Sequence, residues 1–142
     1  MEFLISIAEK LLKLILGDLF YKNKIYREKA NEFKETLIKD LPSYESNETT
    51  LGATIIQLFP AHNAAFRKLL LYIPQRKQNK YISQWAEYEN IHSMFSSLGV
   101  FGAVAAILPA EDFRNDPKYI NELERKNKLK ITNVFNYLLK KL

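Results

Sequence analysis

FPAHNAAFRKLLLYIPQRKQNKYISQWAEY, residues 59–88, is the stretch that decides the fold of this chain. On both sides of Pro74 its apolar residues recur at three- and four-residue steps, which is the spacing of one helical face. Proline can open a helix because a first-turn residue needs no amide donor, and it disfavours helical geometry in the residue before it. The sequence therefore predicts two helices, opened by Pro60 and Pro74, that fold back as a hairpin. We expect Trp85, the single tryptophan, to pack in the core.

The composition of the whole chain is that of one compact helical domain. The chain has 142 residues, of which 47% are hydrophobic and 13% aromatic, with only four glycines. A chain of this length can bury roughly 70% of its unfolded surface, which is enough for a core of its own. No stretch alternates long enough for a strand, so we expect a single all-α domain, residues 1–142, built as a bundle of four or five helices. The absence of cysteine excludes disulfides and thiolate metal sites and fits a cytoplasmic protein.

The N-terminal part of the chain predicts one long helix, residues 2–40, whose first half is more apolar than its second. The polar residues of the first half fall in one narrow stripe, and the rest of its circumference is apolar. Charges inside the apolar run make a membrane span costly, and no basic segment precedes the run as in a signal peptide. Such a helix must be covered by the body of the domain, by a second copy of itself or by a lipid surface. The residues expected at a self-association surface are Phe3, Leu4, Ile7, Leu11, Leu14, Ile15 and Leu19.

Three further segments complete the predicted organisation. Residues 42–52 carry proline, serine, asparagine and glycine and predict a loop, while residues 53–58 fit either a helical turn or an extended chain. Residues 93–110 contain no charge, but their glycines, serines and closing proline favour a buried connection or a short core helix over a membrane span. Asp116 and Pro117 then provide a cap and a first-turn proline for a last helix that runs to the end of the sequence.

The candidates for catalysis or metal binding are few. Glu89 and His92 form a Glu-x-x-His motif, which a di-iron bundle uses twice together with two further glutamates. The only other histidine, His62, has no acidic residue three or four positions away, so it fits a helix-start or hairpin contact better than a general base. No nucleophile elbow or phosphate-binding glycine loop is present. The sequence therefore predicts a non-enzymatic protein with no catalytic residue, metal site or cofactor.

Charge is the more informative signal. Between residues 49 and 86 there are five cations and no anion, so this segment alone equals the net charge of +5. Interleaved with tyrosine and tryptophan, these cations could contact the phosphates of nucleic acid or of an anionic membrane. A solvated basic face, neutralised by glutamates of neighbouring helices, explains the same pattern without a ligand. The candidate polyanion-binding residues are Arg67, Lys68, Arg76, Lys77 and Lys80.

The hairpin also resembles a known group of proteins. The residues that carry the resemblance are Phe59, Pro60, His62, Ala64, Ala65, Pro74, Arg76, Trp85 and Tyr88, followed by the segment ITNVFNYLL at 131–139. In this pattern the chain is similar to a set of small uncharacterised bacterial helical proteins, some of which carry an N-terminal membrane segment where this chain has residues 1–21. The resemblance implies a helical fold and no activity.

Together these observations favour an interaction or scaffolding module that self-associates through its N-terminal helix. The alternative is a basic protein that makes weak contacts with nucleic acid or with the surface of an anionic membrane. Salt separates the two, because phosphate binding weakens steeply as salt rises whereas apolar helix association holds or strengthens. We expect a cytoplasmic location, with membrane association as the open alternative, and no small-molecule substrate is indicated.

Overall fold

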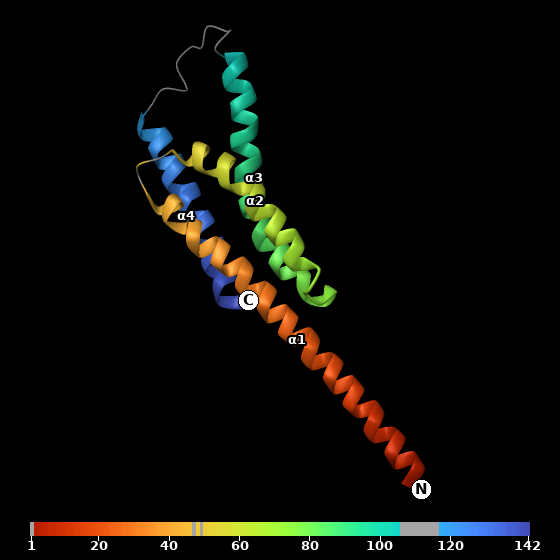
Figure 1. Ribbon diagram of the computed structural model, residues 1–142. Helices are drawn as coiled ribbons and strands as arrows, with labels where there is room; N and C mark the ends of the chain where they lie inside the picture. Colours follow the sequence, from red (N-terminus) through yellow and green to blue (C-terminus); the bar gives the residue numbers. More distant parts are fainter. Residues whose placement is uncertain (1, 47, 49, 106–116) are drawn as a thin grey trace.

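Four helices make up the described part of the chain, residues 2–46, 48, 50–105 and 117–142; side chains are described from residue 5 on, except for 47, 49, 98–117, 119 and 120. In chain order they are α1 (Glu2–Glu45), α2 (Leu51–Leu70), α3 (Gln75–Ala105) and α4 (Pro117–Lys141). This computed structural model is an all-α bundle with a long first helix, as the sequence predicts (Figure 1). Because α1 and α3 each pack against both α2 and α4, the helices surround one core.

α1 is longer at its C-terminal end than the sequence predicts. It spans 44 residues, about 65 Å at 1.5 Å per residue, and continues to Glu45. Pro42 lies inside the helix and α2 begins at Leu51, so the loop predicted at residues 42–52 is wrong at both ends. The missing amide of Pro42 leaves the carbonyl of the exposed Ile38 without its helical donor, at a position where water can replace it. The buried Tyr44 anchors the last turn in the core.

α2 begins earlier than the sequence predicts. The side chain of Thr50 caps its first turn by accepting a hydrogen bond from the amide of Ala53 at 3.4 Å, and Glu124 of α4 accepts one from the amide of Leu51 at 3.2 Å. The ambiguous residues 53–58 are therefore helical. The prediction that Pro60 opens this helix is wrong, because the caps lie farther upstream and Pro60 stands exposed inside α2.

The hairpin between α2 and α3 forms as predicted around Pro74. α2 ends at Leu70 and α3 begins at Gln75. The side-chain Nε2 of Gln78 closes the turn by donating to the backbone carbonyls of Leu70 and Ile73, both at 2.9 Å. α3 then continues without a break to Ala105, so this part of residues 93–110 is neither a connection nor a separate short helix. The remainder of that segment and the predicted Asp116 cap lie outside the described residues, and α4 begins at Pro117 as predicted.

The core is built largely from aromatic rings contributed by all four helices. Trp85 of α3 is only 1% exposed, which confirms its prediction as a core residue. Its ring stacks on Phe66 of α2 at 4.3 Å between centroids and lies 5.8 Å from Phe33 of α1. Phe135 of α4 meets Tyr88 of α3 edge to face at 5.3 Å. These contacts fix the hairpin against the second half of α1 and against α4.

Candidate functional site

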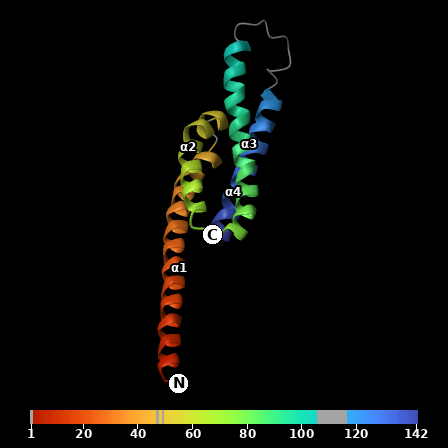
Figure 2. The same cartoon turned by 90° about the vertical axis from the view of Figure 1, so that its right-hand side faces the viewer.

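The first half of α1 projects from the bundle. All side chains in residues 5–24 are exposed, whereas α1 begins to bury side chains from Ile25 onward. This half extends alone past the ends of the other helices in both views (Figures 1 and 2). We call residues 5–24 the projecting segment. Its large apolar side chains are exposed by 40–76% and are Ile5, Ile7, Leu11, Leu12, Leu14, Ile15, Leu16, Leu19, Phe20 and Tyr21.

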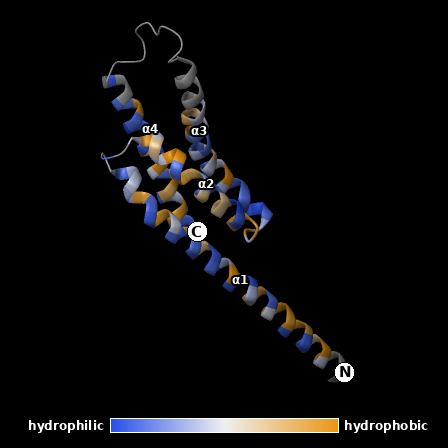
Figure 3. Cartoon of the chain, turned by 45° about the horizontal axis from the view of Figure 1, so that its top comes forward, coloured by the Kyte–Doolittle hydropathy of each residue, from blue (hydrophilic) through white to orange (hydrophobic). Residues whose placement is uncertain are grey.

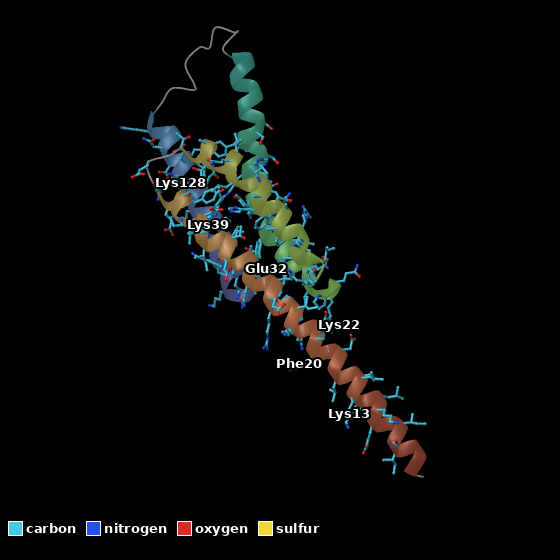
Figure 4. All side chains as sticks on the ribbon, in the orientation of Figure 1. Lys13, Phe20, Lys22, Glu32, Lys39 and Lys128 are labelled. Atoms are coloured by element: carbon cyan, nitrogen blue, oxygen red, sulfur yellow. The ribbon has the colours of Figure 1, made fainter. Side chains whose placement is uncertain are left out.

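The residues predicted for self-association lie on this segment. Their described members are Ile7, Leu11, Leu14, Ile15 and Leu19, all of them exposed, while the side chains of Phe3 and Leu4 lie outside the described residues. Hydropathy colouring shows apolar residues along the segment, well away from the core (Figure 3). The labelled Lys13 and Phe20 stand clear of α2, α3 and α4 (Figure 4). Of the three covers that the sequence leaves open, the body of the domain is therefore excluded for residues 5–24.

The apolar face of the projecting segment is in register with the face by which α1 packs in the body. Ala30, Phe33 and Leu37 face the core, and stepping back by three or four residues leads to Leu19 and Ile15 on the same side. The face is interrupted near its exit from the body by Asp18 and Lys22, which form an ion pair of 2.8 Å with each other. The same side of the helix thus serves as core inside the body and, beyond this polar break, as exposed apolar surface outside it.

A hollow of about 780 Å³ lies where the projecting segment leaves the body. Its walls are α1 on one side, the turn between α2 and α3 with the first turns of α3 on another, and the end of α4 on the third. We call it the lysine hollow. Its apolar and aromatic lining comprises Tyr21, Ile25, Tyr26, Leu71, Tyr72, Ile73, Pro74, Tyr81 and Leu142, and its charged lining comprises Asp18, Lys22, Lys77, Lys80 and Lys141.

The side-chain charge of the lysine hollow is strongly positive. Four ammonium groups meet one carboxylate, and that carboxylate, on Asp18, is already paired with Lys22. Lys80 lies 4.7 Å above the ring of Tyr81, a cation–π contact that leaves its charge in place. Lys77, Lys80 and Lys141 have no ion pair within the described part of the chain. Three cations therefore face a largely apolar floor.

The five predicted polyanion-binding residues do not form one uniform surface. Arg67 is paired with Glu89 across the hairpin. Lys68 lines a small cleft that also contains Glu32 of α1, whose carboxylate pKa is lowered by Lys29 and, more weakly, by Lys68. The remaining members are Arg76, which is exposed at the start of α3, and Lys77 and Lys80, which line the lysine hollow.

His62 occupies the centre of a buried hydrogen-bond chain that sequence reasoning did not find. Its Nε2 lies 2.8 Å from Oδ2 of Asp40, and its Nδ1 lies 2.9 Å from the hydroxyl of Tyr88. The Tyr88 hydroxyl in turn bonds to that of Tyr44. The chain joins α1, α2 and α3, and the ring of Phe135 from α4 covers it edge to face at 5.5 Å from both Tyr44 and His62.

The protons of this chain have one consistent order when His62 is neutral. Tyr44 donates to Tyr88, Tyr88 donates to Nδ1 of His62, and Nε2–H donates to the Asp40 carboxylate. Burial lowers the pKa of His62 more than Asp40 raises it, so the neutral ring is favoured. Burial also raises the pKa values of Tyr44 and Tyr88. His62 and both tyrosines are fully buried, so the chain ties α1, α2 and α3 together inside the core.

The two residues of the Glu-x-x-His motif make contacts other than with each other. Its Glu89 is paired with Arg67, and its His92 stacks on Phe59 at 4.0 Å between ring centroids. Nε2 of His92 lies 3.3 Å from the hydroxyl of Ser96. Within the described residues no group of three or more potential ligands is arranged to hold a metal ion.

Sequence reasoning missed residues that come from distant parts of the chain. The acid beside His62 is Asp40, which lies 22 positions upstream on α1. Helical spacing of three or four residues does not indicate a contact over this distance in the sequence. Lys22 and Lys141 were missed for the same reason, because α1 and α4 bring them to the lysine hollow from opposite ends of the sequence. A pattern that would have indicated Lys22 is the break in the apolar face of α1 at this position.

Two further findings bear on what the chain is. Across the described helices, none combines the length and the apolarity that crossing a bilayer requires. Comparisons with models of protein families, with curated proteins and with solved structures gave no match to this chain.

Proposed function

We propose that this chain is a non-enzymatic helical interaction module that self-associates through its projecting segment. The observation that carries the proposal is the exposure of ten large apolar side chains along residues 5–24, outside the body. Contiguous apolar surface of this kind marks interaction sites in soluble proteins and otherwise promotes aggregation. Burying one such leucine or isoleucine contributes about 1.5–3 kcal/mol, so a pair of helices has ample driving force.

A second copy of the same helix is the partner that fits this surface best. The apolar residues cover most of the circumference and leave one polar stripe, as expected for a helix packed among other helices. A two-fold pair is the commonest assembly by which soluble chains cover such a surface. The stripe includes Glu9, Lys10 and Lys13, which keep one side of the pair in contact with water.

The second candidate is a protein of anionic surfaces, either nucleic acid or membrane. The observation that favours it is the group of lysines at the lysine hollow that lack an ion pair among the described residues. Against a membrane surface, the polar stripe of the projecting segment mixes both signs of charge, whereas helices that lie on membranes are usually cationic there. Self-association needs no such bias and remains our first candidate.

Sedimentation of the full chain in detergent-free buffer tests the proposal. We expect a species heavier than the 16.6 kDa monomer, which persists as salt rises. The variant Leu12→Gln/Leu19→Gln should be monomeric and folded, because both side chains are more than half exposed. Lys10→Gln/Lys13→Gln on the polar stripe is the matched control and should associate like the wild type.

Deletion of residues 1–20 is the second arm of this test. The deletion should leave a folded monomer, because all described side chains that it removes are exposed. A full chain that is monomeric at micromolar concentration, or a deletion that unfolds the body, contradicts the proposal. A monomer that binds anionic vesicles and loses them as salt rises would favour the second candidate.

A further inference from the structure

We propose that the lysine hollow binds an anionic amphiphile, with a carboxylate or phosphate head group and an apolar tail. The hollow measures about 780 Å³, within the range of roughly 300–1,000 Å³ that small-molecule sites occupy. Its lining divides into an apolar floor and a cationic rim. The apolar tail of such a ligand matches the floor, and its anionic head group matches the rim. This inference does not depend on self-association, because every residue that lines the hollow belongs to one chain.

The rim supplies the head-group site. Lys77, Lys80 and Lys141 project from two different helices, and no described carboxylate pairs with any of them. Counting side chains alone, four lysines face Asp18, so the hollow carries an excess of three positive charges; the terminal carboxylate of Leu142 would reduce it to two. An anion is therefore the occupant that lowers the electrostatic energy of this corner.

The floor supplies the tail site. Ile73 and Tyr81 are buried in the core with their edges at the hollow, and Leu142 packs against the same core. On the α1 side Ile25 and Tyr26 continue this surface. The hydroxyl of Tyr81 donates to the backbone carbonyl of Lys141 at 3.2 Å, which ties the end of α4 to the floor.

A second copy of α1 does not satisfy this hollow. In an antiparallel pair the approaching end of the partner helix is its N-terminus, which carries the positive end of the helix dipole toward the lysines. In a parallel pair the partner brings a second set of the same lysines to the same level of the helix. Either arrangement leaves the positive excess in place, so a separate anion remains the better occupant.

Calorimetric titration of the full chain with decyl phosphate below its critical micelle concentration tests the site. We expect one ligand per chain. Decyl maltoside has the tail without the charge and inorganic phosphate has the charge without the tail, so each should bind at least tenfold more weakly. Equal binding of decyl maltoside would overturn the proposal, and so would binding to anionic vesicles without binding to decyl phosphate, because the occupant is then a membrane surface.

Two variants test separately the charge of the rim and the volume of the hollow. Lys77→Gln/Lys80→Gln should weaken decyl phosphate binding roughly fivefold, as expected for two exposed charge contacts. Lys126→Gln/Lys130→Gln removes the same charge from two exposed lysines one turn apart on α4 and should leave binding unchanged. Asn23→Trp, at an exposed residue of the lining, fills the hollow without changing its charge and should also weaken binding.

The same variants can also contradict the proposed site. Unchanged affinity in both Lys77→Gln/Lys80→Gln and Asn23→Trp overturns the site. The outcome is independent of the proposed function: a monomeric chain that binds decyl phosphate one to one contradicts self-association and supports the hollow. An oligomeric chain that does not bind decyl phosphate supports self-association and contradicts the binding site in the hollow.

Discussion

The two halves of α1 belong to one helix and carry apolar residues on the same side, yet only the second half buries them in the core. Residues 26–44 place Ala30, Phe33, Leu37 and Tyr44 in the core, whereas residues 5–24 expose ten large apolar side chains. The difference lies in the length of the other helices. α2 has 20 residues and α4 has 25, about 30 and 38 Å, so neither can cover a helix of about 65 Å. The apolar face of α1 thus shows which side of the helix needs to be covered. The lengths of α2 and α4 determine which part of that face is buried within one chain.

Trp85→Ala attacks the contacts of the buried half and should have the largest effect. The ring packs between Phe66 and Phe33, so its removal leaves a cavity and should cost about 3–5 kcal/mol of unfolding free energy. Phe20→Ala on the projecting segment, where the ring is 76% exposed, is the control and should stay within about 0.5 kcal/mol. Denaturant melts of dilute protein measure both. An unchanged midpoint for Trp85→Ala would show that the tryptophan is not a core residue.

Leu37→Ala and Leu14→Ala compare the two halves by the same substitution. Leu37 is fully buried, so we expect a loss of about 2–5 kcal/mol in the free energy of unfolding. Leu14 is exposed, so its substitution should leave the unfolding of the dilute monomer nearly unchanged and should weaken self-association instead. Similar losses from both variants at low concentration would mean that the body covers the projecting segment after all.

Acid should destabilise the buried half through His62. Its pKa is lowered in the folded state, chiefly by burial, so the unfolded chain binds more protons below the ordinary value of 6.5. Stability should therefore be complete above about pH 6.5 and fall as the pH drops toward the lowered folded pKa. The groups that face the ring are Asp40, Tyr44 and Tyr88, and protonation reverses the hydrogen bond to Tyr88.

Unfolding midpoints measured across this pH range check the effect. His62→Phe should remove most of the pH dependence, whatever its own cost in stability. His92, whose pKa is also lowered by partial burial, contributes in the same direction, and His92→Gln should remove less of the dependence because this ring is more exposed. A slope that is unchanged in His62→Phe would exclude the buried chain as its cause.

Local pattern predicts the helices of this chain and their ends near Pro74 and Pro117, but not the end of α1, the start of α2 or the long-range partners. Periodicity indicates α1, the hairpin around Pro74 and α4, because each helix has an apolar face that the sequence shows directly. The position of Pro60 misleads, since the caps that start α2 include Glu124 from α4, a contact that only the folded chain creates. The Asp40 partner of His62 and the gathering of lysines in the hollow depend on packing in the same way.

Glycine-to-alanine substitutions give the smallest and finest test of the comparison. At Gly17, inside the projecting segment, an added methyl group meets nothing within 4 Å, so Gly17→Ala should stabilise the local helix by about 0.5–1 kcal/mol. At Gly52 in the first turn of α2 the same methyl group would approach Phe95 of α3 to 3.1 Å, so packing strain should offset the gain there.

Where the gain at Gly17 appears is the decisive observation. In the dilute monomer the side chains of the projecting segment are exposed, and only its last turns, at residues 18–23, line the hollow beside the body. Opening of the segment at Gly17 is therefore a local event that does not require the core to unfold. Gly17→Ala should therefore slow amide hydrogen exchange in residues 5–24 and leave both the unfolding midpoint and the exchange of the core amides unchanged. Gly52→Ala should act on the global midpoint, because its helix is part of the cooperative body. If Gly17→Ala instead raises the global free energy of unfolding of the dilute monomer by about 0.5–1 kcal/mol, the two halves of α1 unfold as one unit. The distinction between them is then wrong.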